Sequence, residues 1–174
     1  DITTPLMSCH KFNEASRVHA VLDDIRAGKK VALITDSGTP AVSDPGSRMV
    51  AACHAQGLHV EVIPGPSAAT AALAASGFGG ASFVFAGFLP VKPGARAKML
   101  DRSQEAPAPG VFFESPPRLL KLPGQLNERA PEREVYIGRE LTKTFEEHLV
   151  GKPAELLERL SGRTIKGEIV VVVR

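Results

Sequence analysis

The sequence predicts an α/β protein built from two parts. In the first part, apolar segments of strand character alternate with helical segments, an order that favours a parallel sheet with right-handed crossovers. Glycines cluster in "GFGGAS", residues 77–82, and the pattern changes there. Strands then outnumber helices, which is typical of a mixed or antiparallel sheet with helices on a face. We therefore expect two domains, residues 1–78 and residues 79–174.

The first part begins with an amphipathic helix. Apolar residues at helical spacing predict this helix over residues 13–27, and the apolar segment "KKVALIT", residues 29–35, predicts a buried strand. A second helix is expected over residues 45–57, with Asp44 as its N-cap and Pro45 in its first turn. The order so far is helix, strand, helix.

A second strand and a third helix complete the first part. The alternating segment "LHVEVIP", residues 58–64, predicts the strand. The alanine-rich segment of residues 68–76 predicts the helix, with Ser67 as its N-cap and Gly77 as its end. The two strands should be neighbours in a parallel sheet, with their following loops at one edge.

The second part should contain four strands and two helices. The strands are expected in "FVFAGF", "GVFFES", "REVYIGREL" and "GEIVVVV", and the basic stretch "VKPGARAKML" separates the first two of them. Helices are expected in "PPRLLKLPGQL", which Pro123 interrupts, and in "PAELLERL". This composition predicts a mixed-sheet α/β domain.

Composition excludes several classes of protein. No apolar run approaches the roughly 18 to 20 residues that span a bilayer, so we expect no membrane segment and a cytoplasmic location. Cys9 and Cys53 lack ligand spacing and are expected to be reduced thiols. His54 and His59 form no metal-binding pattern, so no metal is expected. The net charge of +2 permits a nucleic-acid partner without requiring one.

Two loops follow the predicted strands of the first part, "TDSGTPAVSDPG" at residues 35–46 and "PGPSAA" at residues 64–69. Glycine and proline hold such loops open and present backbone amides and carbonyls without bulky side chains. No P-loop and no G-x-G-x-x-G motif occurs, which disfavours an ATPase and a dinucleotide enzyme. The loops therefore predict a small-ligand site, although loops that only turn the chain remain an alternative.

Charged residues gather at predicted strand ends in the second part. Such clusters form a cleft or are solvated edges, and the sequence leaves both readings open. The residues concerned are Glu114, Ser115 and Arg118, then Arg139, Glu140, Thr142 and Lys143, and finally Lys166 and Glu168.

The motifs "TDSGTPAVSDPG", "VIPGPSAATAAL", "GFLP", "FFESPPRL", "GRELTKTFEE" and "KGEIVVVV" occur in an order that resembles the tetrapyrrole methylase superfamily over nearly the whole chain. Within it, "SGTP" with "DPG" and "RELTK" resemble the branch that methylates small-subunit ribosomal RNA. Relatives that act on porphyrins carry a G-D-P type loop where this chain has Gly38-Thr39-Pro40. The chain is thus similar to an RNA-directed branch of the superfamily.

The resemblance implies a two-domain tetrapyrrole methylase-like fold, a homodimer, and S-adenosylmethionine bound between the domains. The implied reaction is 2'-O-methylation of a cytidine in small-subunit (16S) rRNA of the 30S subunit. By motif position, Glu140 and Lys143 are the candidate catalytic residues, and Lys166 and Gly167 are weaker cofactor candidates. The implied cofactor-binding residues are Ser37, Gly38, Thr39, Val42, Ser67, Ala68, Glu114 and Leu141.

Basic residues could contact rRNA phosphates, because such contacts set affinity and register. The candidates are Arg118, Arg139 and Lys143, with Lys92, Arg96 and Lys98 in the basic stretch. Family members begin with a further strand and loop upstream, so we expect an N-terminally truncated form whose first parallel sheet lacks its first strand. Two alternatives remain: a methylase of a small tetrapyrrole, and a non-catalytic fragment that binds RNA or a partner.

Overall fold

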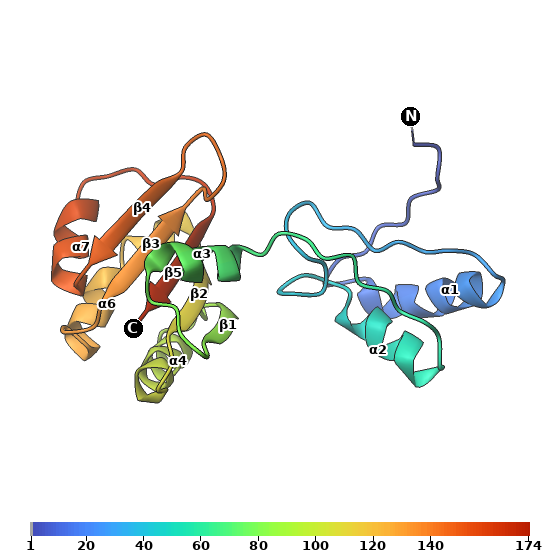
Figure 1. Cartoon of the computed structure of the whole chain (residues 1–174), viewed down its shortest axis with the longest axis horizontal. Helices are drawn as coiled ribbons and strands as arrows, with labels where there is room; N and C mark the ends of the chain where they lie inside the picture. The colour runs from blue at the N-terminus through green and yellow to red at the C-terminus, as the bar shows by residue number, and fades with distance from the viewer. Residues whose placement is uncertain (1) are drawn as a thin grey trace. The chain divides into compact units, whose positions relative to one another are not determined.

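The computed structural model describes residues 2–174, apart from the side chain of Gln104. The chain forms two compact units, of which the first ends at Pro66 and the second spans Ser67–Arg174 (Figure 1). This division differs from the predicted domain boundary after residue 78 by one helix, α3 (Ala68–Ser76), which contacts the sheet of the second unit. Each unit is described by itself below.

The first unit is built on two packed helices, α1 (Glu14–Arg26) and α2 (Ser47–Ala55). Both were predicted, and their apolar faces supply the buried residues of this unit. The buried apolar side chains are Val21, Leu22, Met49 and Cys53. The predicted start of α2 is wrong, because Gly46 is the N-cap residue and Asp44 makes no cap hydrogen bond. The Asp44 carboxylate instead accepts a hydrogen bond from the Thr35 hydroxyl at 3.2 Å.

The two strands predicted for the first unit are not formed. Residues 29–35 and 58–64 carry no strand assignment, and among residues 2–174 no strand precedes Val84. Ile34 and Ile63 are 75% and 76% exposed. A strand is stabilised by ladder hydrogen bonds and by apolar contacts on its faces, so an extended segment without a paired neighbour gains neither.

The second unit is built on a five-stranded mixed sheet with the order β1-β2-β5-β3-β4. Strand β1 runs parallel to β2, and every other neighbouring pair is antiparallel. The mixed sheet predicted for the second part is therefore confirmed. The strands are β1 (Val84–Phe88), β2 (Gly110–Glu114), β3 (Val135–Arg139), β4 (Glu147–Gly151) and β5 (Ile169–Val173).

Helices cover both faces of this sheet (Figure 1). One face packs against α4 (Pro93–Glu105), α5 (Pro116–Leu119), α6 (Leu122–Arg129) and α7 (Pro153–Leu160) in a core that includes Phe112, Leu126 and Leu156. The other face packs against α3 through a smaller cluster that includes Ala72 and Tyr136. The central strand β5 is buried along its whole length, which agrees with its unbroken valine run.

Helix α4 and strand β4 were not predicted. Helix α4 covers the basic stretch, and its buried residues Arg96 and Leu100 stand in a segment of mostly polar sequence. In β4 only Leu149 is buried, so this strand lacks the alternating apolar pattern from which a strand is predicted. The predicted interruption at Pro123 is confirmed: α5 ends before it, and proline occupies the first turn of α6, where its missing N–H is harmless.

The register of the sheet gathers several strand ends at one edge. Ile169, the first residue of β5, lies opposite Glu114 at the end of β2 and opposite Arg139 at the end of β3. Arg139 in turn pairs with Glu147 at the start of β4. We call this edge the Ile169 end of the sheet, and the charged clusters predicted from the second part all adjoin it.

Candidate functional site

The loop of residues 35–46 in the first unit has an unusual backbone. Gly38 has φ +76, and two residues with side chains, Ala41 and Ser43, have φ +64 and +63. Left-handed conformations are costly for residues other than glycine and persist only where surrounding contacts determine them. This loop is therefore held in one particular conformation by its neighbours.

The first loop contacts the second predicted loop within the same unit. The Thr39 hydroxyl donates a hydrogen bond to the Pro66 carbonyl at 3.2 Å. A Cβ atom added at Gly38 would lie 3.7 Å from the Pro66 carbonyl oxygen, and one added at Gly65 would lie 3.8 Å from the Thr39 hydroxyl. Ser37 and Val42 are exposed on this loop. The structure thus brings together the two loops that the sequence singled out.

A distant carboxylate supports the end of the first loop. Glu14 on α1 is only 7% exposed, and its Oε1 accepts hydrogen bonds from the backbone N–H groups of Gly46 and Arg48, both at 2.9 Å. These amides belong to the N-terminal turn of α2, where donors lack partners within the helix. Glu14 therefore does what was predicted for Asp44. The sequence offered only a glutamate inside an amphipathic helix, 32 residues away.

In the second unit, the loop after β3 carries the candidate catalytic residues. Glu140 has φ +50 and Thr142 has φ +67. The Lys143 ammonium donates to Glu140 Oε1 and to Glu168 Oε2, both at 3.0 Å. Glu140 Oε1 also accepts the backbone N–H of Glu168 at 2.7 Å. These contacts join the "RELTK" and "KGE" motifs at the Ile169 end.

The electrostatics of this cluster hold both groups in their charged forms. The hydrogen bond from the Glu168 backbone, followed by that from Lys143, lowers the pKa of Glu140. The hydrogen bonds to Glu168 and Glu140 raise the pKa of Lys143. A carboxylate with a lowered pKa is a weak base, and an ammonium with a raised pKa is a stable positive charge. The cluster is therefore suited to presenting a cation.

Close packing supports this cluster from the opposite loop. Gly167 has φ +94, and a Cβ atom added there would lie 2.5 Å from the Glu140 side chain. Leu141 is half-buried and packs near Gly138, where an added Cβ would lie 2.9 Å from it. The Lys166 carbonyl accepts a hydrogen bond from Arg139 at 3.3 Å. Glycine is thus required at position 167 for both conformation and space.

Glu114 occupies a different setting from the one its predicted role requires. It is 2% exposed, its Oε1 lies 2.7 Å from Arg118 Nε, and its Oε2 lies 2.5 Å from Arg96 Nη1. Arg96 Nε also donates to Gln125 at 2.7 Å. Among the described residues, neither Nη atom of Arg96 nor Glu114 Oε2 makes a hydrogen bond, so Arg96 and Glu114 interact as an ion pair. The Glu114 carboxylate is therefore engaged by two guanidinium groups.

This ion cluster determines which of the predicted basic residues are exposed and able to contact rRNA phosphates. Arg96 is 4% exposed and paired, so the expected contact between Arg96 and rRNA phosphate is wrong for this conformation. Arg118 donates to the Leu89 carbonyl at 2.8 Å and thereby links the "GFLP" and "FFESPPRL" motifs. Lys92 and Lys98 are exposed. Buried Arg96 and partly exposed Arg118 are engaged within the fold, and the exposed lysines remain available.

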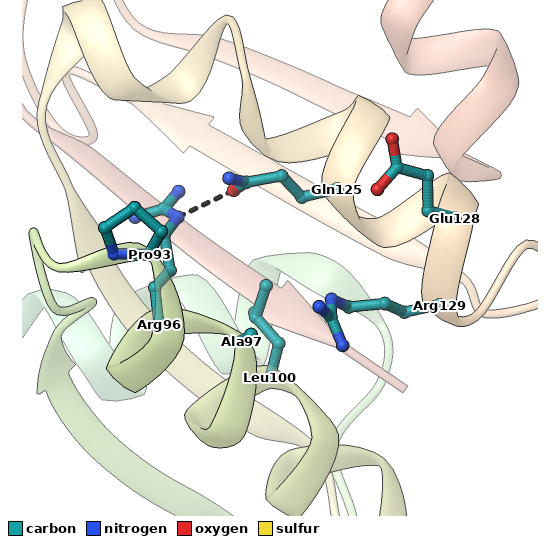
Figure 2. Close-up of a pocket in the computed structure, with 7 residues that line it drawn as sticks. All are labelled: Pro93, Arg96, Ala97, Leu100, Gln125, Glu128 and Arg129. Atoms are coloured by element: carbon teal, nitrogen blue, oxygen red, sulfur yellow. Dashed lines mark hydrogen bonds between the residues drawn. The ribbon is translucent and has the colours of Figure 1, made fainter.

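A small cavity lies beside Arg96, between α4 and α6 (Figure 2). It has a volume of about 120 Å³. Figure 2 shows Arg96 reaching toward Gln125, while the Glu128 carboxylate points away from them. Because the cavity lies between two helices, it is distinct from the loops that carry the predicted residues. The lining residues are Pro93, Arg96, Ala97, Leu100, Gln125, Glu128 and Arg129.

The remaining predicted residues, Ser67 and Ala68, lie at the start of α3. Ser67 has an extended backbone and occupies the N-cap position, but its side chain makes no cap hydrogen bond. Its carbonyl instead accepts the Thr70 hydroxyl at 3.1 Å. Ala68 is exposed. No group of three or more metal-binding side chains and no helix able to cross a membrane occurs among residues 2–174.

The family model of tetrapyrrole (corrin/porphyrin) methylases matches residues 2–157. The chain is 41% identical over 172 residues to the ribosomal RNA small subunit methyltransferase I of Thermotoga maritima, covering 99% of this chain and 77% of that protein. It is 47% identical over 166 residues to the protein of the same name from Mesorhizobium japonicum, covering 94% of this chain and 56% of that protein. The chain thus spans only part of these relatives.

Solved structures with the same architecture include the methyltransferase CobJ, with a TM-score of 0.65 at 22% identity over 91% of this chain and 70% of that chain. Another is a uroporphyrin-III C-methyltransferase from Thermus thermophilus complexed with S-adenosyl homocysteine. Its TM-score is 0.57 at 16% identity, over 91% of this chain and 73% of that one. These likenesses confirm the predicted α/β fold class.

Proposed function

The chain belongs to the tetrapyrrole methylase family and, within it, to the group of ribosomal RNA small subunit methyltransferase I, and we propose that it transfers a methyl group from S-adenosylmethionine to small-subunit rRNA. The proposed acceptor is the 2'-hydroxyl of a cytidine. Support for an RNA substrate comes from relatives of that name at 41% and 47% identity. We further propose that the protein is cytoplasmic and forms a homodimer. Light scattering of the purified protein tests the dimer.

One observation carries the location of the site. Among the described residues, the four non-glycine residues with positive φ are Ala41, Ser43, Glu140 and Thr142. All four lie in the two loops that the sequence motifs single out, 35–46 and 139–143. Backbone strain of this kind clusters at active sites and ligand clamps. The coincidence supports a functional role for each loop within its own unit.

The residues of these loops fit the proposed cofactor. S-adenosylmethionine combines a nucleoside with an amino acid, and such a ligand binds through shape and backbone groups where small residues allow close approach. When bound, the cofactor supplies the reactive methyl group on a sulfonium ion. The residues proposed to hold it are Ser37, Gly38, Thr39, Val42, Ser67, Ala68 and Leu141. Glu114 belongs to this set only through its backbone, because its carboxylate is already paired.

Lys143 and Glu140 are proposed to act on the acceptor hydroxyl. Because its pKa is raised by Glu168 and Glu140, the Lys143 ammonium stays protonated and is suited to stabilise negative charge that develops on the ribose oxygen. Because its pKa is lowered, Glu140 is a poor acceptor of that proton and serves to hold Lys143. The proton then leaves to solvent or to a group on the RNA. Exposed Lys92 and Lys98 are proposed phosphate contacts.

Methyl transfer from tritiated S-adenosylmethionine to purified small ribosomal subunits tests this proposal. We expect label in rRNA, at a 2'-O-methylated cytidine identified by alkaline hydrolysis and mass spectrometry. Lys143→Met should lower the rate of methyl transfer about a hundredfold. Lys121→Met, which changes an exposed lysine outside the loop of residues 139–143, should leave this rate unchanged. Label in a tetrapyrrole but not in rRNA would favour the small-molecule alternative. Absence of cofactor binding in calorimetry would favour a non-catalytic binding fragment.

A further inference from the structure

A chain of side-chain hydrogen bonds runs from the buried sheet to the loop after β3. The Tyr136 hydroxyl lies 2.7 Å from His148 Nδ1, and His148 Nε2 lies 2.9 Å from Glu146 Oε1. The other carboxylate oxygen of Glu146 accepts the backbone N–H of Thr142. Thr142 is one of the two left-handed residues in the loop that carries the candidate catalytic pair, Glu140 and Lys143. The chain therefore connects the core directly to the strained part of this loop.

The chemistry of the groups sets the direction of these bonds. A carboxylate only accepts, so His148 Nε2 must carry the proton that it shares with Glu146. In the neutral imidazole, Nδ1 is then the acceptor, and the Tyr136 hydroxyl donates to it. Donation runs from Tyr136 through His148 to Glu146, and Thr142 donates to Glu146 from the other side. Both ring nitrogens are occupied, so His148 has no free nitrogen to act as a general base.

The two ends of this hydrogen-bonded chain differ in burial. Tyr136 is fully buried in the cluster beneath α3, and burial followed by the charge of Glu146 raises the pKa of its hydroxyl, which keeps it a donor. Its hydroxyl lies beside Gly138, where an added Cβ atom would be 2.8 Å away. The hydrogen bond from the Thr142 backbone, followed by that from His148, lowers the pKa of Glu146, which keeps it an acceptor. A buried residue, Tyr136, is thus linked to an exposed one, Glu146.

We propose that Tyr136, His148 and Glu146 are positioning residues that hold the loop of residues 139–143 in its active conformation. The proposal rests on the proposed function only in assigning methyl transfer to that loop. Left-handed residues with side chains persist where the surroundings determine them, and Glu146 supplies that constraint at Thr142. With Thr142 fixed, Lys143 is directed toward Glu140 and Glu168. None of the three residues is proposed to touch the cofactor or the RNA.

Amide hydrogen exchange measured by mass spectrometry tests the positioning role without reference to activity. We expect Glu146→Ala and His148→Leu to raise exchange in a peptide covering residues 140–146 by about tenfold, because each removes charge-assisted or linked hydrogen bonds. Exchange in β5 should stay unchanged. His148→Gln, which retains a donor toward Glu146, should recover part of the protection. The matched control Glu158→Gln removes an exposed carboxylate on α7 and should behave as wild type.

Kinetics separate positioning from a merely structural effect. We expect Tyr136→Phe, which removes one oxygen atom, and His148→Leu to lower kcat with little change in KM for small subunits, and His148→Gln to restore part of kcat. Unchanged amide exchange of the 140–146 peptide in both Glu146→Ala and His148→Leu would overturn the proposed positioning role. If exchange increases in these variants but the wild-type chain transfers no methyl group, the result supports the positioning role and contradicts the proposed function.

Discussion

Replacing Glu114 with glutamine should destabilise the second unit by about 4 kcal/mol. The side chain is 2% exposed and lies within 2.7 Å of two guanidinium groups, from Arg96 and Arg118. Glutamine has almost the same shape but no charge. The substitution therefore leaves two arginines, one of them almost fully buried, without a counter-charge in the interior.

The magnitude follows from the cost of leaving a buried charge without its partner. Removing one partner of a buried ion pair costs about 3–5 kcal/mol, because the remaining charge stays buried and uncompensated. Arg118 is 26% exposed, so water screens part of its loss. A value of about 4 kcal/mol lies within this range and is a large part of the stability of an ordinary domain.

Urea denaturation followed by tyrosine fluorescence measures this change in the second unit alone. The chain contains one tyrosine, Tyr136, and no tryptophan, and Tyr136 is buried in the sheet of that unit. Glu128→Gln, an exposed carboxylate on α6, is the matched control and should change the free energy of unfolding by less than about 0.5 kcal/mol. Adding Arg96→Met to Glu114→Gln should recover much of the loss, because it removes the stranded charge.

The opposite result would assign Glu114 to the cofactor. If Glu114→Gln unfolds at the same urea concentration as the wild-type chain but no longer binds S-adenosylmethionine in calorimetry, the carboxylate is a ligand group. The ion pair would then be dispensable for the fold, and the structural reading of Glu114 would be wrong.

Three further predictions concern the loops. Glu14→Ala should destabilise the packed helices α1 and α2 by about 2 kcal/mol, because it leaves the backbone N–H groups of Gly46 and Arg48 without an acceptor, and Glu14→Gln should destabilise them less. Amide exchange in α2 measures both effects, and equal protection in the wild type and both variants would contradict the role of Glu14 in supporting the loop. Gly167→Ala should lower methyl transfer tenfold to a hundredfold, because its Cβ would lie 2.5 Å from Glu140, whereas Gly162→Ala, with the same left-handed strain but open space, should not. The pKa of Glu140 is lowered and that of Lys143 raised by their mutual contacts and by Glu168, so the loop ordering that they contribute should be complete between about pH 5 and about pH 10. It should be lost as the pH falls through the folded pKa of Glu140 or rises through that of Lys143, and an NMR titration showing either shift reversed would refute the pairing.

The second unit was the more predictable one, for physical reasons. Strand β5 consists of Ile169 and four valines, which favour extended backbone and bury both faces. Strand β4 was missed because only Leu149 is buried in it, and its place in the sheet comes from pairing with β3 rather than from its own apolar pattern. Helix α4 was missed because its buried positions include Arg96, whose burial depends on Glu114 in another element.

The first unit shows the limit of local patterns. Its helices α1 and α2 were predicted closely, since helical periodicity is a property of the segment itself. The strands predicted over residues 29–35 and 58–64 need a partner to supply ladder hydrogen bonds, and no segment among residues 2–66 supplies them. An apolar run indicates that a segment can be a strand, whereas pairing decides whether it becomes one.

The loop of residues 35–46 was predicted from its glycines and prolines and the loop of residues 139–143 from its charged residues, but Glu14 and Glu146, the carboxylates that hold their backbones, were not singled out. Each loop contains left-handed residues with side chains, and each has an acidic residue outside the strained turn that accepts at least one of its backbone N–H groups: Glu14 for the loop of residues 35–46, and Glu146 for the loop of residues 139–143. A glutamate that accepts backbone N–H groups does not change the apolar periodicity of its own segment, because its partners are determined by the tertiary fold. Strain identifies such residues after the fact, since a costly backbone conformation requires a compensating contact. Searching for the acceptor that satisfies each strained loop is therefore a direct route from structure to positioning residues, and here it leads from Thr142 through Glu146 and His148 to Tyr136.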